Sequence, residues 1–222
     1  MLKTYFPVQP SEDILTKILV MNRNVKHYYQ AMERGSWEPI MGEPELTDAT
    51  VGVLGTGSIG RELAKKIQGF ATRLIGYRRS IGEVIGFSEI YHGEQGLRKV
   101  IQESDYLVVA LPLNRETKGL LDKEKLALMK PSALLINVGR GEVVDQEALA
   151  NLLKNRHIRG AALDVTTPEP LPPDHELWRM DHVFITPHNA VSSPQLPFRL
   201  AKLSGDNLAR FLNHEPVVNQ VR

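Results

Sequence analysis

From Thr50 onward, short apolar runs alternate with stretches in which apolar residues recur at helical spacing, and this alternation limits the fold more than any other feature of the chain. Strands that are apolar almost throughout must be buried on both faces, as parallel strands connected by helices are. The sequence therefore predicts an α/β fold with a doubly wound parallel sheet. The predicted strands are Val51–Leu54, Arg73–Tyr77, Tyr106–Leu111, Ala133–Val138, Ile158–Leu163 and Val183–Ile185.

Helices are predicted between these strands and on either side of the sheet region. The intervening helices are Ser58–Phe70, Glu94–Glu103, Lys123–Met129 and Gln146–Lys154. Upstream, Ser11 is placed to cap one long amphipathic helix that ends near Gly35. Its apolar stripe comprises Ile14, Ile18, Met21, Val25, Tyr28 and Met32. Downstream, residues 195–214 predict a last helix, whose apolar positions are Leu200, Leu203, Leu208, Phe211 and Leu212.

A glycine-rich turn follows the first predicted strand, where Gly55, Gly57 and Gly60 form a G-x-G-x-x-G motif. In such a turn the first glycine permits the tight bend, the second lets the backbone approach a pyrophosphate, and the third lets helix and strand pack closely. The free N–H groups of a helix that starts near Ser58 would face the phosphates, while Ile59 packs the helix on the sheet. The motif predicts a Rossmann dinucleotide site; the alternative is a glycine-rich turn without a ligand.

The end of the second predicted strand indicates which dinucleotide is preferred. A site that prefers NAD places Asp or Glu there to bind the ribose 2′-hydroxyl, whereas this chain has Arg78, Arg79 and Ser80. No acid stands there to repel a 2′-phosphate, and two guanidinium groups with a hydroxyl can bind one. The sequence therefore predicts NADP(H) as the preferred cofactor and NAD(H) as the second choice. The alternative is that both arginines are solvated surface charges.

Three later strands are each followed by polar residues, at the sheet edge where open α/β sheets bind ligands. Arg140 follows the fourth predicted strand, Glu169 stands in the Pro-rich segment after the fifth, and His188 follows the sixth. Side chains on adjacent loops could form one site, although the sequence alone does not prove that they converge. A lone histidine in a loop is more often a surface residue, since the chain contains seven.

Composition excludes several classes of function. The 222 residues include 27 Lys and Arg against 26 Asp and Glu, so the formal net charge is +1. This balance gives no excess of positive charge for binding nucleic acid or an anionic membrane. No apolar run approaches the roughly 18 residues of a membrane span. Residues 1–7 contain no signal-peptide core, so we expect a cytoplasmic protein. The absence of cysteine excludes disulfides and thiolate ligands, and no metal site is expected.

Several motifs in order resemble the D-isomer-specific 2-hydroxyacid dehydrogenases, which include glyoxylate/hydroxypyruvate reductases and phosphoglycerate dehydrogenases. The resemblance runs from about Ser11 to the C-terminus. Besides the glycine turn, it rests on Ala110-Leu111-Pro112-Leu113 with Thr117, Asn137-Val138-Gly139-Arg140-Gly141, Ala161-Ala162-Leu163-Asp164-Val165, Pro168-Glu169-Pro170-Leu171-Pro172 and Thr186-Pro187-His188. Together these motifs are far more specific than any one alone.

The resemblance implies a role for each of these side chains in hydride transfer between NADP(H) and a small 2-keto or 2-hydroxy acid. His188 would be the acid and base at the substrate oxygen, and Glu169 would orient its ring. Arg140 would hold the substrate carboxylate and carbonyl. The residues expected along the cofactor are Gly55, Gly57, Ser58, Ile59, Gly60, Arg78, Arg79, Ser80, Leu111, Pro112, Thr117, Val138, Gly139, Arg140, Asp164, His188 and Ala190.

The chain departs from the family in its domain organisation. Family members split a substrate domain between the two ends of the chain, with the cofactor domain inserted between the halves; here most of the first half is expected to be missing. We divide the chain into a helical arm (1–44), a cofactor-binding domain (45–190) and a C-terminal helix left from the substrate domain (191–222). Three alternatives follow: a fragment of a 2-keto-acid reductase, a natural short reductase, or a non-catalytic NADP(H)-binding module. A homodimer is expected from the family.

Overall fold

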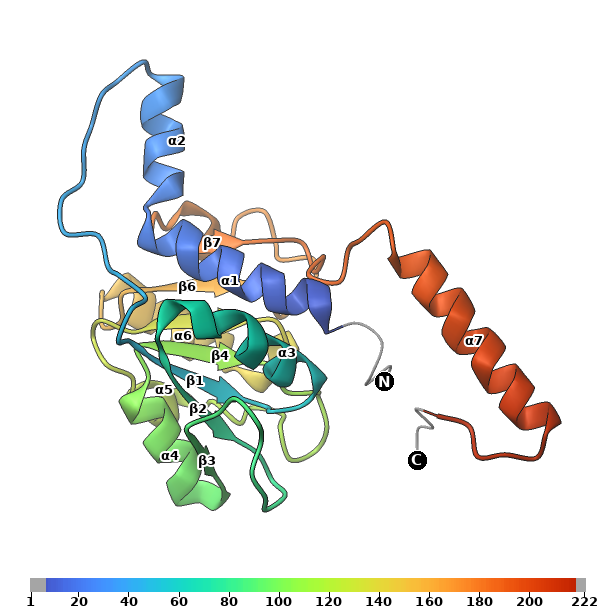
Figure 1. Cartoon of the computed structure of the whole chain (residues 1–222). Coiled ribbons are helices and arrows are strands. Elements are labelled where there is room, and N and C mark those ends of the chain that lie inside the picture. The colour runs from blue at the N-terminus through green and yellow to red at the C-terminus, as the bar shows by residue number, and fades with distance from the viewer. Residues whose placement is uncertain (1–6, 219–222) are drawn as a thin grey trace.

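The computed structural model describes residues 7–218, and within them seven parallel strands form one sheet in the order β3-β2-β1-β4-β5-β6-β7 (Figure 1). The strands are β1 (Thr50–Leu54), β2 (Arg73–Tyr77), β3 (Glu89–Tyr91), β4 (Tyr106–Val109), β5 (Leu134–Asn137), β6 (Gly160–Leu163) and β7 (Val183–Ile185). The strand order reverses direction between β1 and β4, which creates the crevice where doubly wound sheets bind ligands. Residues 1–6, on which the absence of a signal peptide was predicted, and residues 219–222 lie outside the described part.

Helices cover both faces of the sheet, and its strands are therefore buried on both sides. The helices are α1 (Val8–Asn22), α2 (Val25–Glu33), α3 (Ser58–Ile67), α4 (Gly93–Glu103), α5 (Lys123–Leu126), α6 (Gln146–Lys154) and α7 (Leu196–Leu212). One core cluster joins the sheet to α1 and α3, and a second joins it to α4, α5 and α6. The prediction of a doubly wound Rossmann sheet is confirmed.

The structure corrects several predicted boundaries. It adds β3 at the sheet edge, a three-residue strand that pairs with β2. Predicted Ser58–Phe70 is an α-helix only to Ile67 and ends in a 3-10 turn at Gln68–Phe70. The fourth predicted helix, Gln146–Lys154, matches α6. Short strands and helix ends are the elements that an apolar pattern defines least well.

The single long N-terminal helix was a wrong prediction. The chain breaks at Asn24, whose φ of 46° lies in the left-handed region, and α1 and α2 follow as separate helices. Asparagine adopts this conformation more readily than most residues. Ser11 does not cap the helix either: it lies inside α1, and its Oγ donates a hydrogen bond to the carbonyl of Val8 at 2.6 Å.

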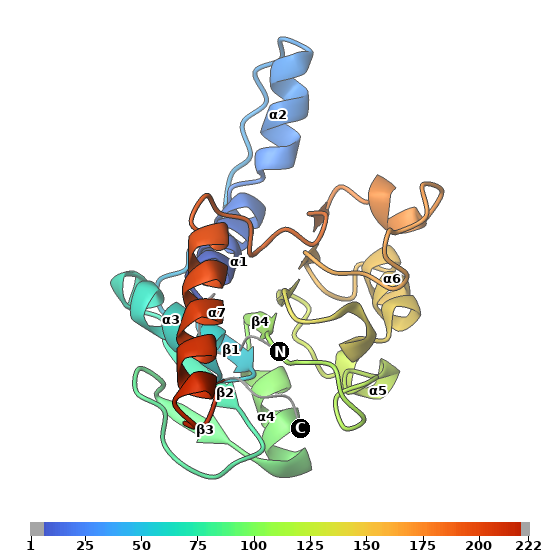
Figure 2. The ribbon, with the colours of Figure 1, turned by 90° about the vertical axis from the view of Figure 1, so that its right-hand side faces the viewer.

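The two ends of the predicted apolar stripe have different surroundings as a result. Ile14 and Ile18 of α1 are fully buried against the sheet, whereas Met32 of α2 is 68% exposed. Figure 1 shows α2 and α7 extending away from the sheet, and Figure 2 shows the same for α2 from a second side. Of α7, only Leu203 is buried among the residues that the structure describes. No helix within residues 7–218 combines the length and the apolar character needed to cross a bilayer.

Candidate active site

The glycine turn leads from β1 directly into α3 and has the geometry that its motif predicts. Gly55 has a φ of 106°, and a Cβ there would lie 2.7 Å from the carbonyl oxygen of Ala110. A Cβ on Gly60 would lie 2.7 Å from the oxygen of Gly55. Gly57 is the N-cap of α3, and a Cβ there would meet nothing within 4 Å. Two glycines are therefore required by packing, while Gly57 leaves an open approach to the helix N-terminus, where anions bind.

The basic residues after β2 lie at the surface. Arg79 Nη1 forms an ion pair with Glu116 Oε2 at 2.5 Å, and the two side chains are 82% and 63% exposed. Arg78 is half-buried, and its carbonyl oxygen lies 2.9 Å from His92 Nδ1. Ser80 is exposed. The segment after β2, residues 78–80, is called the β2 end below. It is open to solvent, and one of its two guanidinium groups is already paired.

The loops after β4 and β5 are held by hydrogen bonds from their own polar side chains. Thr117 donates to the carbonyl of Pro112 at 2.6 Å, which fixes the turn after β4. Asn137 Oδ1 accepts from the backbone N–H of Gly139 at 3.0 Å. Arg140 Nη1 donates to the carbonyl of Gly139 at 2.6 Å. Both loops are therefore shaped locally before any ligand binds.

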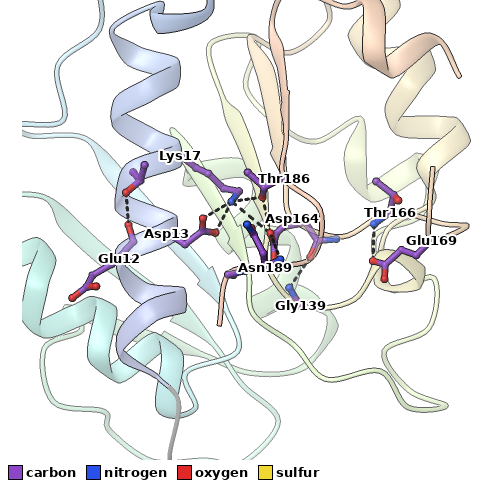
Figure 3. Close-up of polar contacts among 12 residues, drawn as sticks. Glu12, Asp13, Lys17, Gly139, Asp164, Thr166, Glu169, Thr186 and Asn189 are labelled. Carbon is purple, nitrogen blue, oxygen red and sulfur yellow. Dashed lines mark hydrogen bonds and ion pairs between the residues drawn. The ribbon is translucent and has the colours of Figure 1, made fainter. Parts of the chain in front are cut away.

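The loop after β7 is anchored by the buried carboxylate of Asp164, at the end of β6. Its Oδ1 accepts hydrogen bonds from Thr186 Oγ1 at 2.6 Å and from the N–H of Asn189 at 3.1 Å, and its Oδ2 accepts from the N–H of Ala190 at 3.0 Å (Figure 3). The N–H of His188 donates to the carbonyl of Asp164 at 2.8 Å. These bonds hold His188 at a φ of 51°, in the left-handed region that costs a histidine energy to adopt.

His188 and Glu169 form a pair across two loops. His188 Nδ1 lies 2.8 Å from Glu169 Oε2, and Glu169 Oε1 accepts from the N–H of Thr166 at 3.1 Å. Because a carboxylate only accepts, Nδ1 is the nitrogen that carries the shared proton. Nε2 is then the ring atom available to a substrate. Both side chains are partly exposed, His188 by 43% and Glu169 by 38%.

A cleft of about 780 Å³ runs along this edge of the sheet and collects most of the predicted residues. From the prediction, its lining contains Gly57, Ser58, Ile59, Leu111, Pro112, Val138, Gly139, Arg140, Asp164, His188 and Ala190. The predicted residues outside the lining are Gly55, Gly60, Arg78, Arg79, Ser80, Thr117 and Glu169. Glu169 reaches the cleft through its bond to His188. The structure thus brings Arg140 and His188, from different strands, into one cleft.

Sequence reasoning missed other members of the site. The lining also includes Pro10 of α1, Ala110, Arg61 of α3, Val191, and Leu196 and Leu200 of α7. Lys17 and Thr186 lie behind the lining, in contact with Asp164. The spacing of Asp13 and Lys17, four residues apart on one helix, was the available sign of an ion pair.

The residues of the cleft fit a dinucleotide. The open helix N-terminus beside Gly57 can take a pyrophosphate, and the largely apolar walls can cover rings. Within residues 7–218, no three His, Asp or Glu side chains are grouped as a metal site would require.

Comparison with known proteins identifies the family. Residues 15–190 match the model of the D-isomer specific 2-hydroxyacid dehydrogenase NAD binding domain. The chain belongs to this family. Its doubly wound sheet and glycine turn are accordingly those of a 2-hydroxyacid dehydrogenase cofactor domain.

Individual relatives agree with this assignment. A glyoxylate reductase of Thermofilum pendens is 36% identical over 207 residues, which cover 89% of this chain and 60% of that protein. Across the first curated relatives, the chain spans 56% to 60% of their length.

Solved structures of the family show the same fold. A D-isomer specific 2-hydroxyacid dehydrogenase from Xanthobacter autotrophicus, solved with NADPH and MES, superposes with a TM-score of 0.86 at 34% identity, covering 96% of this chain and 87% of that one. An NADPH-dependent glyoxylate/hydroxypyruvate reductase from Sinorhizobium meliloti, solved with NADP and sulfate, gives 0.86 at 29% identity, covering 98% and 69%.

Proposed function

We propose that this chain carries the cofactor-binding and acid–base parts of an oxidoreductase that transfers hydride between NADP(H) and a small 2-keto or 2-hydroxy acid. The observation that carries the proposal is the 2.8 Å contact between His188 Nδ1 and Glu169. His188 lines the same cleft as Arg140 and the glycine turn. An imidazole oriented by a carboxylate, an arginine and a phosphate-binding turn are the groups that such a reaction needs in one place.

Each of these side chains has a stated task. The nicotinamide, when bound, supplies or accepts the hydride. His188 Nε2 gives a proton to the substrate oxygen during reduction and takes it back during oxidation. Glu169 accepts the hydrogen bond of the Nδ1 proton throughout, so that Nε2 faces the substrate, protonated before it donates in reduction and unprotonated before it accepts in oxidation. Arg140 binds the substrate carboxylate and fixes the carbonyl in line with the cofactor.

The preference for NADP(H) rests on charge at the end of β2. Arg78 and Arg79 can bind a 2′-phosphate, and no acidic residue replaces them at that position. The surface exposure of Arg79 leaves it free to turn toward a phosphate once its bond to Glu116 is exchanged. The binding of NADPH by the named structural relatives, which were solved with NADPH or NADP, supports this preference.

The division at residues 44 and 190, a cytoplasmic location and a homodimeric state are further parts of the proposal. Support for the dimer comes from apolar side chains that α2 and the following segment leave in solvent: Tyr29, Met32, Trp37 and Met41. Trp37 alone is 95% exposed. Met32 and Trp37 line one surface pocket, and neighbouring exposed apolar groups are typical of a surface that another protein covers. Light scattering should give twice the chain mass, and a monomer would contradict the proposal.

The test of function is a matched pair of assays on the purified chain. NADPH and NADH are titrated by nicotinamide fluorescence, and NADPH oxidation is followed with glyoxylate, hydroxypyruvate and a branched 2-keto acid. We expect tighter NADPH binding and measurable oxidation with at least one acid. Equal or tighter binding of NADH would overturn the cofactor preference. If the chain binds NADPH but reduces none of the acids, it is a non-catalytic NADP(H)-binding module and the proposed enzyme activity is wrong.

A further inference from the structure

A fully buried lysine lies behind the cleft, and no step of the proposed reaction uses it. Lys17 of α1 has 0% of its side chain exposed. Its Nζ donates to both carboxylate oxygens of Asp13, at 2.5 and 2.6 Å, and to Thr186 Oγ1 at 2.8 Å. It also forms an ion pair with Asp164 Oδ1 at 3.9 Å. Figure 3 shows these four side chains meeting between α1 and the strand ends.

This cluster lies next to the residues that fix the loop of His188, residues 186–190. Thr186 accepts from Lys17 and donates to Asp164 Oδ1, so its hydroxyl links the ammonium to the carboxylate. Asp164 in turn accepts from the N–H groups of Asn189 and Ala190, the two residues that directly follow His188. One lysine on α1 is therefore connected, through one hydroxyl and one carboxylate, to the backbone that carries His188.

The charges of the cluster explain why a lysine is needed. The Asp164 side chain is 1% exposed and that of Asp13 is 19% exposed, and a carboxylate with so little solvation is strongly unfavourable when it is unpaired. Burial raises the pKa of Asp13 above its usual value, and the bond to Lys17 opposes that rise. Among residues 7–218, no other Lys, Arg or His forms an ion pair with either carboxylate. Lys17 therefore supplies the positive charge that faces both carboxylates.

We propose that Lys17 is a positioning residue that sets the His188 loop through Thr186 and Asp164. The inference rests on the proposed function for its kinetic part, because a turnover effect requires that His188 act as the acid and base. Its structural part, the order of residues 186–190, can be measured without any reaction. A purely structural lysine would act differently: it would neutralise Asp13 and stabilise the fold without affecting the loop.

Two variants separate these roles. Lys17→Met keeps the stem of the side chain and removes the charge, which leaves the carboxylates of Asp13 and Asp164 without their shared cation. The double variant Asp13→Asn/Lys17→Met removes the Asp13 carboxylate as well and leaves only that of Asp164 without a cation, so it should be more stable than the single variant. The matched control is Lys66→Met. Lys66 of α3 also binds α1, through Ser11 Oγ at 3.1 Å and Glu12 at 2.8 Å, but it contacts none of the loops of the site.

The readouts are thermal unfolding, amide hydrogen exchange by NMR, and kcat with KM for the best 2-keto acid. In the double variant we expect the amides of Asn189 and Ala190 to exchange about tenfold faster than in the wild type, the size expected when hydrogen bonds to a charged group weaken. The amide of Leu149, in α6, serves as the reference for global stability. We expect kcat to fall by about tenfold, with a smaller change in KM. The loop positions the proton donor His188, whereas the substrate carboxylate is bound by Arg140. Lys66→Met should leave both measurements at the wild-type value.

The outcomes are distinguishable. If the double variant has wild-type stability, exchange and kcat, Lys17 only neutralises Asp13 and the positioning role is wrong. If its exchange and kcat change while Lys66→Met leaves them unchanged, the role is established. If the wild type binds NADPH but reduces no acid, the proposed function fails, and the exchange of Asn189 and Ala190 still decides whether Lys17 orders the loop.

Discussion

Two regions of the candidate site are built in opposite ways: the loop of His188 with Asp164, here called the acid–base end, and the residues after β2, the β2 end. At the acid–base end, Asp164 is 2% exposed and accepts four hydrogen bonds or ion contacts from side chains and backbone. At the β2 end, Arg79 is 82% exposed and its one ion pair lies in solvent. Removing a hydrogen-bonding or ionic partner costs much more free energy at a buried polar group than at an exposed one.

This difference matches the tasks proposed for the two ends. Proton transfer depends on a donor held within hydrogen-bond reach of the reacting oxygen, so the loop of His188 is fixed by buried contacts before a ligand arrives. Recognition of a 2′-phosphate needs only a mobile positive charge at the surface. We therefore expect substitutions at the acid–base end to cost turnover or folding, and substitutions at the β2 end to shift affinity by modest factors.

The largest effect should follow from removing the imidazole without disturbing its backbone. His188→Asn keeps a residue that tolerates a φ of 51°. We expect kcat to fall by about 10²- to 10⁴-fold, the contribution of general acid–base catalysis, with the Kd of NADPH nearly unchanged. Steady-state NADPH oxidation and a fluorescence titration measure the two quantities.

The matched control for that variant is His214→Asn. His214 also has a positive φ, 57°, but it is exposed and follows α7 outside the cleft lining. Its substitution should leave both constants unchanged. Turnover that survives in His188→Asn would remove this histidine from the mechanism.

Two glycines, Gly57 in the cleft lining and Gly141 next in sequence to the lining residue Arg140, should respond differently to one added methyl group. A Cβ on Gly141 would lie 2.0 Å from the carbonyl oxygen of Thr166, which is backbone and cannot turn away. Gly141→Ala should lower the free energy of unfolding by about 2 kcal/mol or more. Gly57→Ala meets nothing within 4 Å, so stability should stay within about 0.5 kcal/mol while NADPH binding weakens. Chemical denaturation and titration test the pair, and equal loss of stability in both variants would contradict it.

Neutralising the partner of His188 should have a smaller effect than removing the imidazole. Glu169→Gln keeps an oxygen for the N–H of Thr166 but loses the charge that faces Nδ1 at 2.8 Å. We expect kcat to fall about tenfold or more, as for the loss of one hydrogen bond to a charged group. The control is Glu142→Gln, whose side chain lies outside the cleft lining. A kcat within twofold of the wild type would show that the ring is oriented by other contacts.

Sequence patterns were sufficient for the parts of the molecule that packing alone decides. Strands such as Tyr106–Val109 are buried on both faces, so their apolar runs indicated the sheet. The edge strand Glu89–Tyr91 escaped because it is short and half-exposed. The break at Asn24 escaped because no glycine or proline marks it. For the site, the motif order indicated Arg140, Glu169 and His188, but their spatial approach depends on tertiary contacts that a pattern does not contain.

Lys17 was missed for a physical reason. Lysines on an amphipathic helix usually face water or extend along its surface, and Lys17 stands between the buried Ile14 and Ile18. Its carboxylate partners come from two segments far apart in the sequence, α1 and the end of β6. Buried polar networks of this kind are visible only once the fold places their members together.

At the β2 end, removal of both guanidinium groups should affect one cofactor only. Arg78→Ser/Arg79→Ser takes away the charges proposed to bind a 2′-phosphate. The Kd of NADPH should rise about tenfold, while that of NADH should change less than twofold, because only the phosphorylated cofactor loses a charge-assisted hydrogen bond. Parallel titrations measure both, and an equal loss for the two cofactors would place the arginines elsewhere than at the 2′-position.

The smallest predicted effect concerns the residue that competes for Arg79. Glu116 Oε2 holds Arg79 Nη1 at 2.5 Å, so a 2′-phosphate must displace this carboxylate before it can use the arginine. Exposed ion pairs are worth about 0.2–1 kcal/mol, and Glu116→Gln should therefore tighten NADPH binding by about 1.4- to fivefold. NADH, which has no phosphate there, should bind as before, and the gain should shrink as salt is raised. Weaker NADPH binding in Glu116→Gln would mean that the carboxylate holds Arg79 in its binding position instead of competing for it.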